Sequence, residues 1–258
     1  MKYTVFTLFP EIINAYFAAS VMAKAIDRGI ITYRTVNIRD YALDKHRTCD
    51  DAPYGGGPGM LMLPEPLGRA LEAAGASRKT PGAAVVCLSP SGRLFDQAMA
   101  LELAGRDELF LVCGRYEGID QRIIDLYADE EISVGDYVLS SGEIAALTLI
   151  DATYRLVDRV ITPESLEEES FSGGLLEYPQ YTRPEIYATL EVPGVLLSGH
   201  HEQIRRWRLR KRVEKTLAMR PELVRRGREA GIFDAETERI IEDLEAQSPK
   251  GAEEFGNE

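Results

Sequence analysis

Short apolar runs alternate along the first 157 residues with stretches whose apolar positions recur at helical spacing. The apolar runs favour β-strands, which we expect at 3–9, 30–38, 83–88, 109–113 and 132–134. The helical stretches lie between the strands, at 12–28, 64–74, 97–104 and 142–156. Strands separated by helices indicate an α/β fold with a mainly parallel sheet and helices on both faces.

The pattern changes after residue 157. Residues 158–170 are acidic and show neither helical nor strand periodicity over their whole length, which is typical of a linker or a mobile loop. A region rich in Gly, Pro and Tyr follows and leads into a helical C-terminal third. We therefore expect an α/β domain at 1–157, a flexible linker or lid at 158–170, and a small helical domain at 171–258.

Composition places the chain among soluble globular proteins. Of its 258 residues 45% are hydrophobic and 28% charged, which excludes a disordered, collagen-like or disulfide-stapled protein. The three cysteines are scattered, which fits a reducing compartment and no zinc site. Pro10 and Glu11 break the N-terminal apolar run, so it predicts a strand and not a signal peptide. No apolar stretch reaches the ~18 residues of a membrane span, and we expect a cytoplasmic protein.

The charge is unevenly distributed. The formal net charge of −12 argues at first against a nucleic-acid partner. Residues 200–229, however, hold eleven Lys or Arg against four acids, and Trp207 lies among them. Such a cluster fits a patch that binds phosphates or merely an exposed helix face, and Trp207 could stack on a base or anchor its helix.

Several glycine-containing segments could form a binding site. Four glycines fall within residues 55–59, and glycine permits positive φ and a close approach of backbone to ligand. Residues 89–93, 113–120 and 132–143 follow or include expected strands. Because ligands of open α/β sheets bind at the carboxyl ends of the strands, these loops predict one small-molecule site there. Neither a Walker A loop nor a dinucleotide fingerprint is present.

Seven motifs together resemble a known family. In chain order they are YGGGPGM, LSPSGR, CGRYEGID, SVGDYVLSSGE, LIDATYR, YPQYTRPE and VLLSGHHEQIRRWR. They are similar to those of the bacterial tRNA (guanine-N1)-methyltransferases, the TrmD family of the SPOUT superfamily. Several long motifs in one order are far more specific than any single glycine loop. The resemblance implies a homodimer whose α/β domain contains a deep trefoil knot, which no periodicity could indicate.

The resemblance also implies a methyl donor, S-adenosylmethionine, held in the knot by three loops. The residues that correspond to its site are Leu88, Ser89, Pro90, Gly114, Tyr116, Glu117, Gly118, Ser133, Val134, Gly135, Asp136, Tyr137, Val138, Leu139 and Gly142. Ser141 and Ala145 stand at the edge of this site where the family usually has Gly and often Pro.

The implied reaction methylates N1 of guanosine 37 in tRNAs that also carry G at position 36. Arg155 matches the family's catalytic arginine. Glu169 stands where the family usually has an Asp that acts as the general base, with Glu167 and Glu168 as rival candidates. The residues expected to contact tRNA are His46, Asp50, Tyr54, Gly55, Gly56, Gly57, Pro58, Gly59, Arg183, Arg205, Arg206 and Arg208.

Two other functions remain open at this stage. A SPOUT methyltransferase with another RNA target would share the same cofactor loops. A non-catalytic RNA-binding module would share the basic segment but would not bind S-adenosylmethionine. The family is associated with Mg²⁺, although the residues themselves indicate no metal site.

Overall fold

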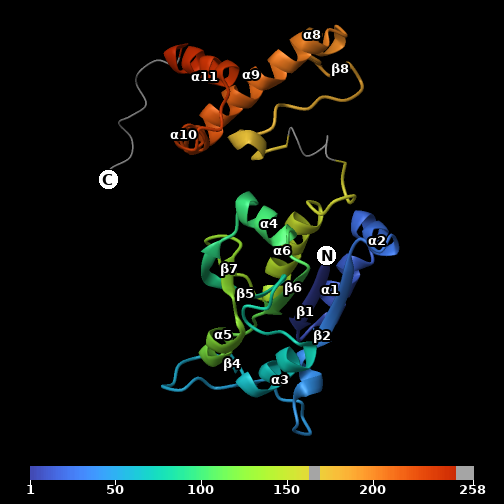
Figure 1. Cartoon of the computed structure of the whole chain (residues 1–258), viewed down its shortest axis with the longest axis vertical. Helices are drawn as coiled ribbons and strands as arrows, with labels where there is room; N and C mark the ends of the chain where they lie inside the picture. Colours follow the sequence, from blue (N-terminus) through green and yellow to red (C-terminus); the bar gives the residue numbers. More distant parts are fainter. Residues whose placement is uncertain (163–168, 248–258) are drawn as a thin grey trace. The chain divides into compact units, whose positions relative to one another are not determined.

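The computed structural model describes residues 1–162 and 169–247 (Figure 1). The chain forms two compact units, Met1–Ile161 and the chain from Thr162 onward. Residues 163–168 and 248–258 lie outside the described part. Glu167, Glu168, much of the expected lid and the acidic C-terminal end fall among them.

The first unit is built on a five-stranded sheet. Its strands are β1 (Lys2–Thr7), β2 (Thr32–Asn37), β5 (Ala83–Leu94), β6 (Glu108–Cys113) and β7 (Glu130–Ser133). They lie in the order β2-β1-β6-β5-β7, and every neighbouring pair is parallel. The mainly parallel sheet expected from the alternating pattern is confirmed.

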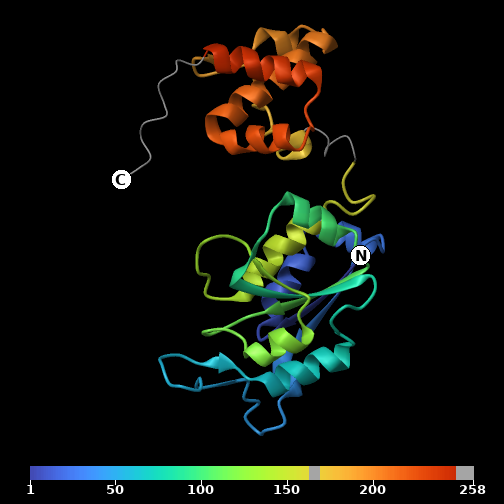
Figure 2. The ribbon, with the colours of Figure 1, turned by 60° about the vertical axis from the view of Figure 1, so that its left-hand side comes forward.

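Helices cover both faces of this sheet (Figure 2). One face packs against α1 (Pro10–Phe17), α2 (Ser20–Asp27), α4 (Gln97–Ala104) and α6 (Gly142–Tyr154). The other packs against α3 (Pro64–Ala74) and α5 (Gln121–Tyr127).

The strands supply both layers because successive side chains point to opposite faces. In β1, Tyr3 and Val5 belong to the core under α1 and α6, whereas Phe6 belongs to the core under α3. Burial on both faces explains why the strands are continuous apolar runs and not alternating patterns.

The single helix expected at 12–28 is wrong, because the structure has two. α1 ends at Phe17, and Ala19 takes an extended conformation before Ser20 adopts φ +56°. The break turns the second helix so that Met22 and Ala25 are buried in the core. The apolar positions recur at helical spacing through residues 12–28, but tertiary packing divides this segment into two helices.

Strand β5 continues beyond the expected end at residue 88. Its pairing with β7 shifts register between Leu88 and Arg93, since both lie opposite Ile132. The residues between them, Ser89–Gly92, bulge away from the ladder. Helix α5 was not expected from the sequence.

A small hairpin extends from the carboxyl edge of the sheet. A 3₁₀ turn, Ile38–Tyr41, precedes β3 (Asp50–Asp51), which pairs antiparallel with β4 (Leu61–Met62). The glycine segment 55–59 is the tip of this hairpin.

The second unit is mainly helical. It comprises a 3₁₀ turn Ser172–Gly174, the short strands β8 (Ile186–Tyr187) and β9 (Leu190–Glu191), and the helices α8 (Gly194–Leu197), α9 (His201–Met219), α10 (Pro221–Glu229) and α11 (Ala235–Gln247). Its core contains Leu175, Val213, Val224 and Ile241. Across residues 1–162 and 169–247, no helix is both long and apolar enough to cross a membrane.

Candidate active site

A pocket of about 330 Å³ lies at the carboxyl edge of the sheet, beyond β5, β6 and β7. Three segments line it: 88–91, which includes the bulge of β5, 114–119, which follows β6, and 133–142, which begins at the last residue of β7. The strands run in parallel, so their carboxyl ends bring the three segments to one place.

The pocket gathers almost all of the residues expected to hold the methyl donor. Asp136 is the exception, since it is exposed and does not line the cavity. Ser141 and Ala145, expected at the edge of the site, also line the pocket. Several further lining residues were not expected from the sequence: Cys87, Ser91, Arg115, Ile119, Gln121, Ile124, Glu131, Ile132 and Ser140. Most are neighbours of the selected residues within the same motifs.

The start of α6 is in backbone contact with the loop after β6. Gly142 N donates a 2.7 Å hydrogen bond to Gly114 O. A Cβ at Gly142 would lie only 2.8 Å from the Cα of Cys113, which leaves no room for a side chain. Ser141, the N-cap of α6, makes no capping hydrogen bond with its side chain, so the helix start is held by this backbone contact.

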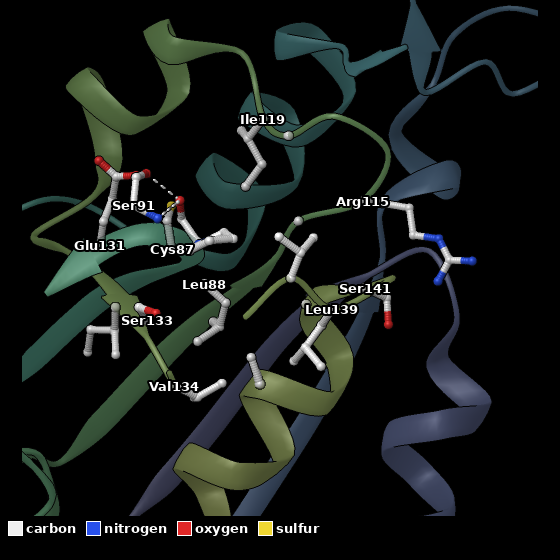
Figure 3. Close-up of a pocket in the computed structure, with 18 of the residues that line it drawn as sticks. Cys87, Leu88, Ser91, Arg115, Ile119, Glu131, Ser133, Val134, Leu139 and Ser141 are labelled. Carbon is white, nitrogen blue, oxygen red and sulfur yellow. Dashed lines mark hydrogen bonds between the residues drawn. The ribbon is translucent and has the colours of Figure 1, made fainter. Parts of the chain in front are cut away.

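The floor of the pocket is apolar. Leu88, Val134 and Leu139 point toward one another in the middle of the site, and the Arg115 side chain extends away from them (Figure 3).

The Arg115 guanidinium lies 4.5 Å from the centre of the Phe9 ring. Ser89 and Ser91 are joined by a 2.7 Å hydrogen bond within the bulge of β5. Such a site offers apolar surface together with backbone donors and acceptors.

Burial controls the ionisation of the nearby thiols. It raises the pKa of Cys87, which lines the pocket, to about 12, with a smaller contribution from Glu131. It also raises the pKa of Cys113 well above its usual value, and the Glu143 carboxylate adds to this. Neither thiol is suited to act as a nucleophile, since the thiolate is the reactive form.

The glycine-rich hairpin is attached directly to the loop after β6. Glu117 N donates to Met60 O at 3.0 Å, and Met62 N donates to Gly118 O at 3.0 Å. Gly59 has φ +86°, and a Cβ there would come within 2.8 Å of the Glu117 Cδ. The hairpin that was expected to bind tRNA is therefore built against a wall of the pocket.

A polar cluster reinforces this attachment. Tyr116 adopts φ +59°, and its hydroxyl interacts with the side chains of Asp50 on the hairpin and Arg39 in the preceding 3₁₀ turn. Partial burial and the Asp50 carboxylate raise the pKa of Tyr116, which Arg39 partly offsets. The sequence reasoning had not selected Arg39.

The tip of the hairpin is open to solvent. Tyr54 is fully exposed, and Gly55, Gly56 and Gly57 all have positive φ with no heavy atom near the space of a Cβ. Pro58 is also exposed, as is His46 in the separate loop between the 3₁₀ turn and β3. The expected tRNA-binding residues Tyr54 to Pro58 thus share the exposed tip of the hairpin.

Arg155 lies at the opposite end of α6 from the pocket. The helix spans thirteen residues from Gly142 to Tyr154, a length of about 20 Å. Thr153, near its end, hydrogen-bonds the hydroxyl of Tyr3 at 2.8 Å, and Tyr3 stands at the amino end of β1. The structure therefore does not bring Arg155 to the pocket of the same chain.

Glu169 is described as part of the second unit. It is partly buried, and its carbonyl oxygen accepts a 3.1 Å hydrogen bond from Ser172 N. The next residue, Ser170, accepts a 3.1 Å hydrogen bond from Glu177 N through its hydroxyl.

The expected tRNA-binding arginines of the second unit differ in their surroundings. Arg183 is exposed. Arg205 forms ion pairs with Glu202 at 3.0 Å and Glu236 at 2.8 Å, and Arg206 pairs with Glu202 at 2.8 Å. Arg208 lies partly buried, 4.7 Å from the centre of the Tyr178 ring. Intramolecular acids thus compensate part of the basic surface.

Within residues 1–162 and 169–247, no group of three or more His, Cys, Asp or Glu side chains is arranged to hold a metal ion.

Comparison with known proteins gives one consistent result. The family described as tRNA (Guanine-1)-methyltransferase TrmD matches residues 1–226. A tRNA (guanine-N(1)-)-methyltransferase of Treponema denticola is 60% identical over 245 residues, 95% of this chain and 99% of that protein. One from Treponema pallidum is 55% identical over 249 residues, which are 96% of this chain and 98% of that protein. One from Borreliella burgdorferi is 56% identical over 225 residues, which are 86% of this chain and 92% of that protein. This chain belongs to the tRNA (guanine-1)-methyltransferase TrmD family.

Proposed function

We propose that this protein is a tRNA (guanine-N1)-methyltransferase that acts on guanosine 37 of tRNAs carrying G at positions 36 and 37. It would transfer a methyl group from S-adenosylmethionine to N1 and so maintain the reading frame. The observation that carries this proposal is the pocket formed by the bulge of β5 and the segments that follow β6 and β7, with the glycine hairpin attached to its wall. Its relatives of similar length bear the name of this reaction.

The pocket suits the methyl donor. Leu88, Val134 and Leu139 would pack against its apolar parts, and the backbone of 114–118 would supply hydrogen-bonding groups to its polar ends. When bound, S-adenosylmethionine supplies a methyl group already activated by its sulfonium charge. The protein then needs no covalent intermediate, and orientation of the two reactants provides much of the acceleration.

The acceptor atom needs a base, because N1 of guanine carries a proton and is not nucleophilic until that proton leaves. We assign this role to Glu169, whose carboxylate would accept the proton, a step typically worth about 10²–10⁴-fold in rate. Negative charge then builds toward O6 of the base. The Arg155 guanidinium would donate hydrogen bonds to that oxygen.

A second copy of the chain would complete the site. Arg155 lies about 20 Å along α6 from the pocket, further than its side chain reaches. A homodimer would place the Arg155 of one copy near the pocket of the other, and the separation of Arg155 from its own pocket supports the dimer that the resemblance implies. The trefoil knot that the resemblance implies belongs to the same proposal.

The tRNA would meet two surfaces. The target base must leave the anticodon-loop stack before it can react. The exposed glycine hairpin, with Asp50 at its base, and His46 in the preceding loop would approach the extruded base and its sugar. Arg183, Arg205, Arg206 and Arg208 would contact phosphates, so binding should weaken steeply with salt. The 158–170 segment is proposed as a lid that orders on tRNA binding.

Two features complete the proposal. A cytoplasmic location accords with a tRNA substrate and with three cysteines that all carry free thiols. Mg²⁺, which the family resemblance associates with the reaction, is given no step.

Methyl transfer to defined tRNA transcripts tests this function. Labelled S-adenosylmethionine is incubated with transcripts carrying G36-G37, A36-G37 or G36-A37, and the product nucleotide is mapped by mass spectrometry. We expect 1-methylguanosine at position 37 of the first transcript alone. Methylation at another nucleotide would favour a different RNA target, and an absence of S-adenosylmethionine binding would favour a non-catalytic RNA-binding module.

A further inference from the structure

Glu143 is a fully buried acidic residue to which the proposed mechanism gives no role. It lies in the first turn of α6 and has 0% exposure. One carboxylate oxygen accepts a 2.6 Å hydrogen bond from the hydroxyl of Thr7, at the carboxyl end of β1. That hydroxyl in turn accepts a 2.9 Å hydrogen bond from Phe9 N. The Thr7 proton is thus directed toward Glu143, which acts as the acceptor.

The second carboxylate oxygen, Oε2, is buried and has no hydrogen-bond partner among the described residues. A buried carboxylate oxygen without a partner is costly and calls for an explanation. No ion pair within residues 1–162 and 169–247 involves Glu143 in the structure. The positive end of the α6 dipole compensates the charge only in part.

The position of Glu143 relates it to the pocket. Its neighbours Gly142 and Ala145 both line the cavity, although Glu143 itself does not. Its charge acts on Cys113, the last residue of β6, and the adjacent Gly114 lines the cavity as well. The carboxylate thus lies beside the carboxyl ends of β1 and β6, next to residues whose backbone neighbours line the cavity.

We propose that Glu143 is the buried counter-charge for the sulfonium of the methyl donor and a specificity-determining residue for it. The donor carries a positive sulfur before transfer, and the product, S-adenosylhomocysteine, has a neutral one. The Glu143 charge attracts the positive sulfur of the donor and not the neutral sulfur of the product. Where the dielectric constant is low, this attraction acts over several ångströms. The pocket would thereby favour donor over product. This inference rests on the proposed function.

A purely structural role is the competing explanation. Glu143 could simply link the start of α6 to β1 through Thr7, and its loss would then weaken every ligand of the pocket alike. The two explanations differ in one quantity, the ratio of the dissociation constants for the donor and for the product.

The experiment measures binding of S-adenosylmethionine and S-adenosylhomocysteine to the full chain by calorimetric titration. Glu143→Gln removes the charge and keeps the shape. Glu143→Met fills the same space with an apolar side chain, a replacement that buried charges often tolerate. Thr7→Val removes the hydrogen bond and leaves the charge. Glu108→Gln is the matched control, because Glu108 also accepts a hydrogen bond from a β1 threonine, Thr4 at 2.7 Å, but at the amino end of β6.

We expect both Glu143 variants to bind the donor about tenfold more weakly and the product within about twofold of the wild type. Thr7→Val and Glu108→Gln should retain the wild-type ratio. An unchanged ratio in both Glu143 variants would overturn the inference, whether the two affinities fall together or not at all. Failure of the wild type to bind either compound would instead count against the proposed function.

Discussion

Gly142 and Gly114 are joined backbone to backbone, by a 2.7 Å hydrogen bond from the amide of the first to the carbonyl of the second. The first residue begins α6 and the second begins the loop after β6, so two loops of the pocket touch without any side chain between them. The shape of the pocket at this point depends on the absence of a Cβ at residue 142.

Substitution Gly142→Ala should therefore disturb the pocket. The new Cβ would lie 2.8 Å from the Cys113 Cα and would force the two loops apart. We expect a loss of about 1–3 kcal/mol in the free energy of unfolding, the usual cost of overpacking, and weaker binding of S-adenosylmethionine. Thermal unfolding and titration measure the two effects. Gly194→Ala is the control, since Gly194 has open space around it and should show neither.

Gly59→Ala and Gly56→Ala together test the attachment of the glycine hairpin. Both positions have positive φ, so both substitutions strain the backbone by about 1 kcal/mol. Only the Cβ at residue 59 would also collide with Glu117 on the pocket wall. We expect kcat/KM for tRNA to fall clearly further in Gly59→Ala than in Gly56→Ala. Equal losses would mean that the contact with Glu117 has no functional consequence.

Mixing two impaired variants, assayed at a donor concentration at which Gly142→Ala alone gives little product, tests whether each site uses two chains. Arg155→Ala should lower kcat by about 10²-fold if the guanidinium stabilises charge at O6. Dimers that combine Arg155→Ala with Gly142→Ala would contain one intact composite site. A one-to-one mixture should regain roughly a quarter of the wild-type rate, because half of the dimers are mixed. No recovery after subunit exchange, checked by differential tagging, would contradict a shared site.

The Cys87 thiol should be unreactive at neutral pH in the folded protein. Burial raises its pKa from 9.0 to about 12, so at pH 8 only about 10⁻⁴ of it is thiolate. A raised folded-state pKa stabilises the fold below pH 9.0, and this contribution disappears as the pH rises toward 12. Alkylation by iodoacetamide, followed by mass spectrometry, should label Cys87 only after denaturation. Labelling of native protein at the rate of a free thiol would refute this.

Acid should weaken the ion pairs of Glu202 at the start of α9. Hydrogen bonds from Arg205 lower the pKa of Glu202 to about 2 from 4.5. A lowered folded-state pKa stabilises the fold above pH 4.5, and that contribution is lost as the pH falls toward 2. Thermal unfolding between pH 6 and pH 2 should show a smaller acid sensitivity in Glu202→Gln. Glu229→Gln is the control, and high salt should reduce the difference because Glu202 is exposed.

The local sequence predicted the bounds of helices best where residues that start, cap or end a helix stand at those bounds. The expected bounds of α3 and α4 agree with the structure, because Pro64 starts one helix, Gly75 ends it and Asp96 caps the other. The expectation failed where packing decides, as at Ala18–Ser20, where a continuous periodicity is split into two helices. It also missed Arg39, which is distant in sequence from Tyr116 and reaches it only in the folded chain.

The sequence by itself determined the class of fold, the order of the motifs and the family, because these depend on residue types and their spacing along the chain. Only the tertiary structure decided which motifs share a site. It joined the glycine hairpin to the loop after β6, separated Arg155 from the pocket by the length of α6, and buried Glu143 beside the carboxyl ends of β1 and β6. These relationships depend on strand order and on contacts between distant residues, and spacing along the chain contains neither.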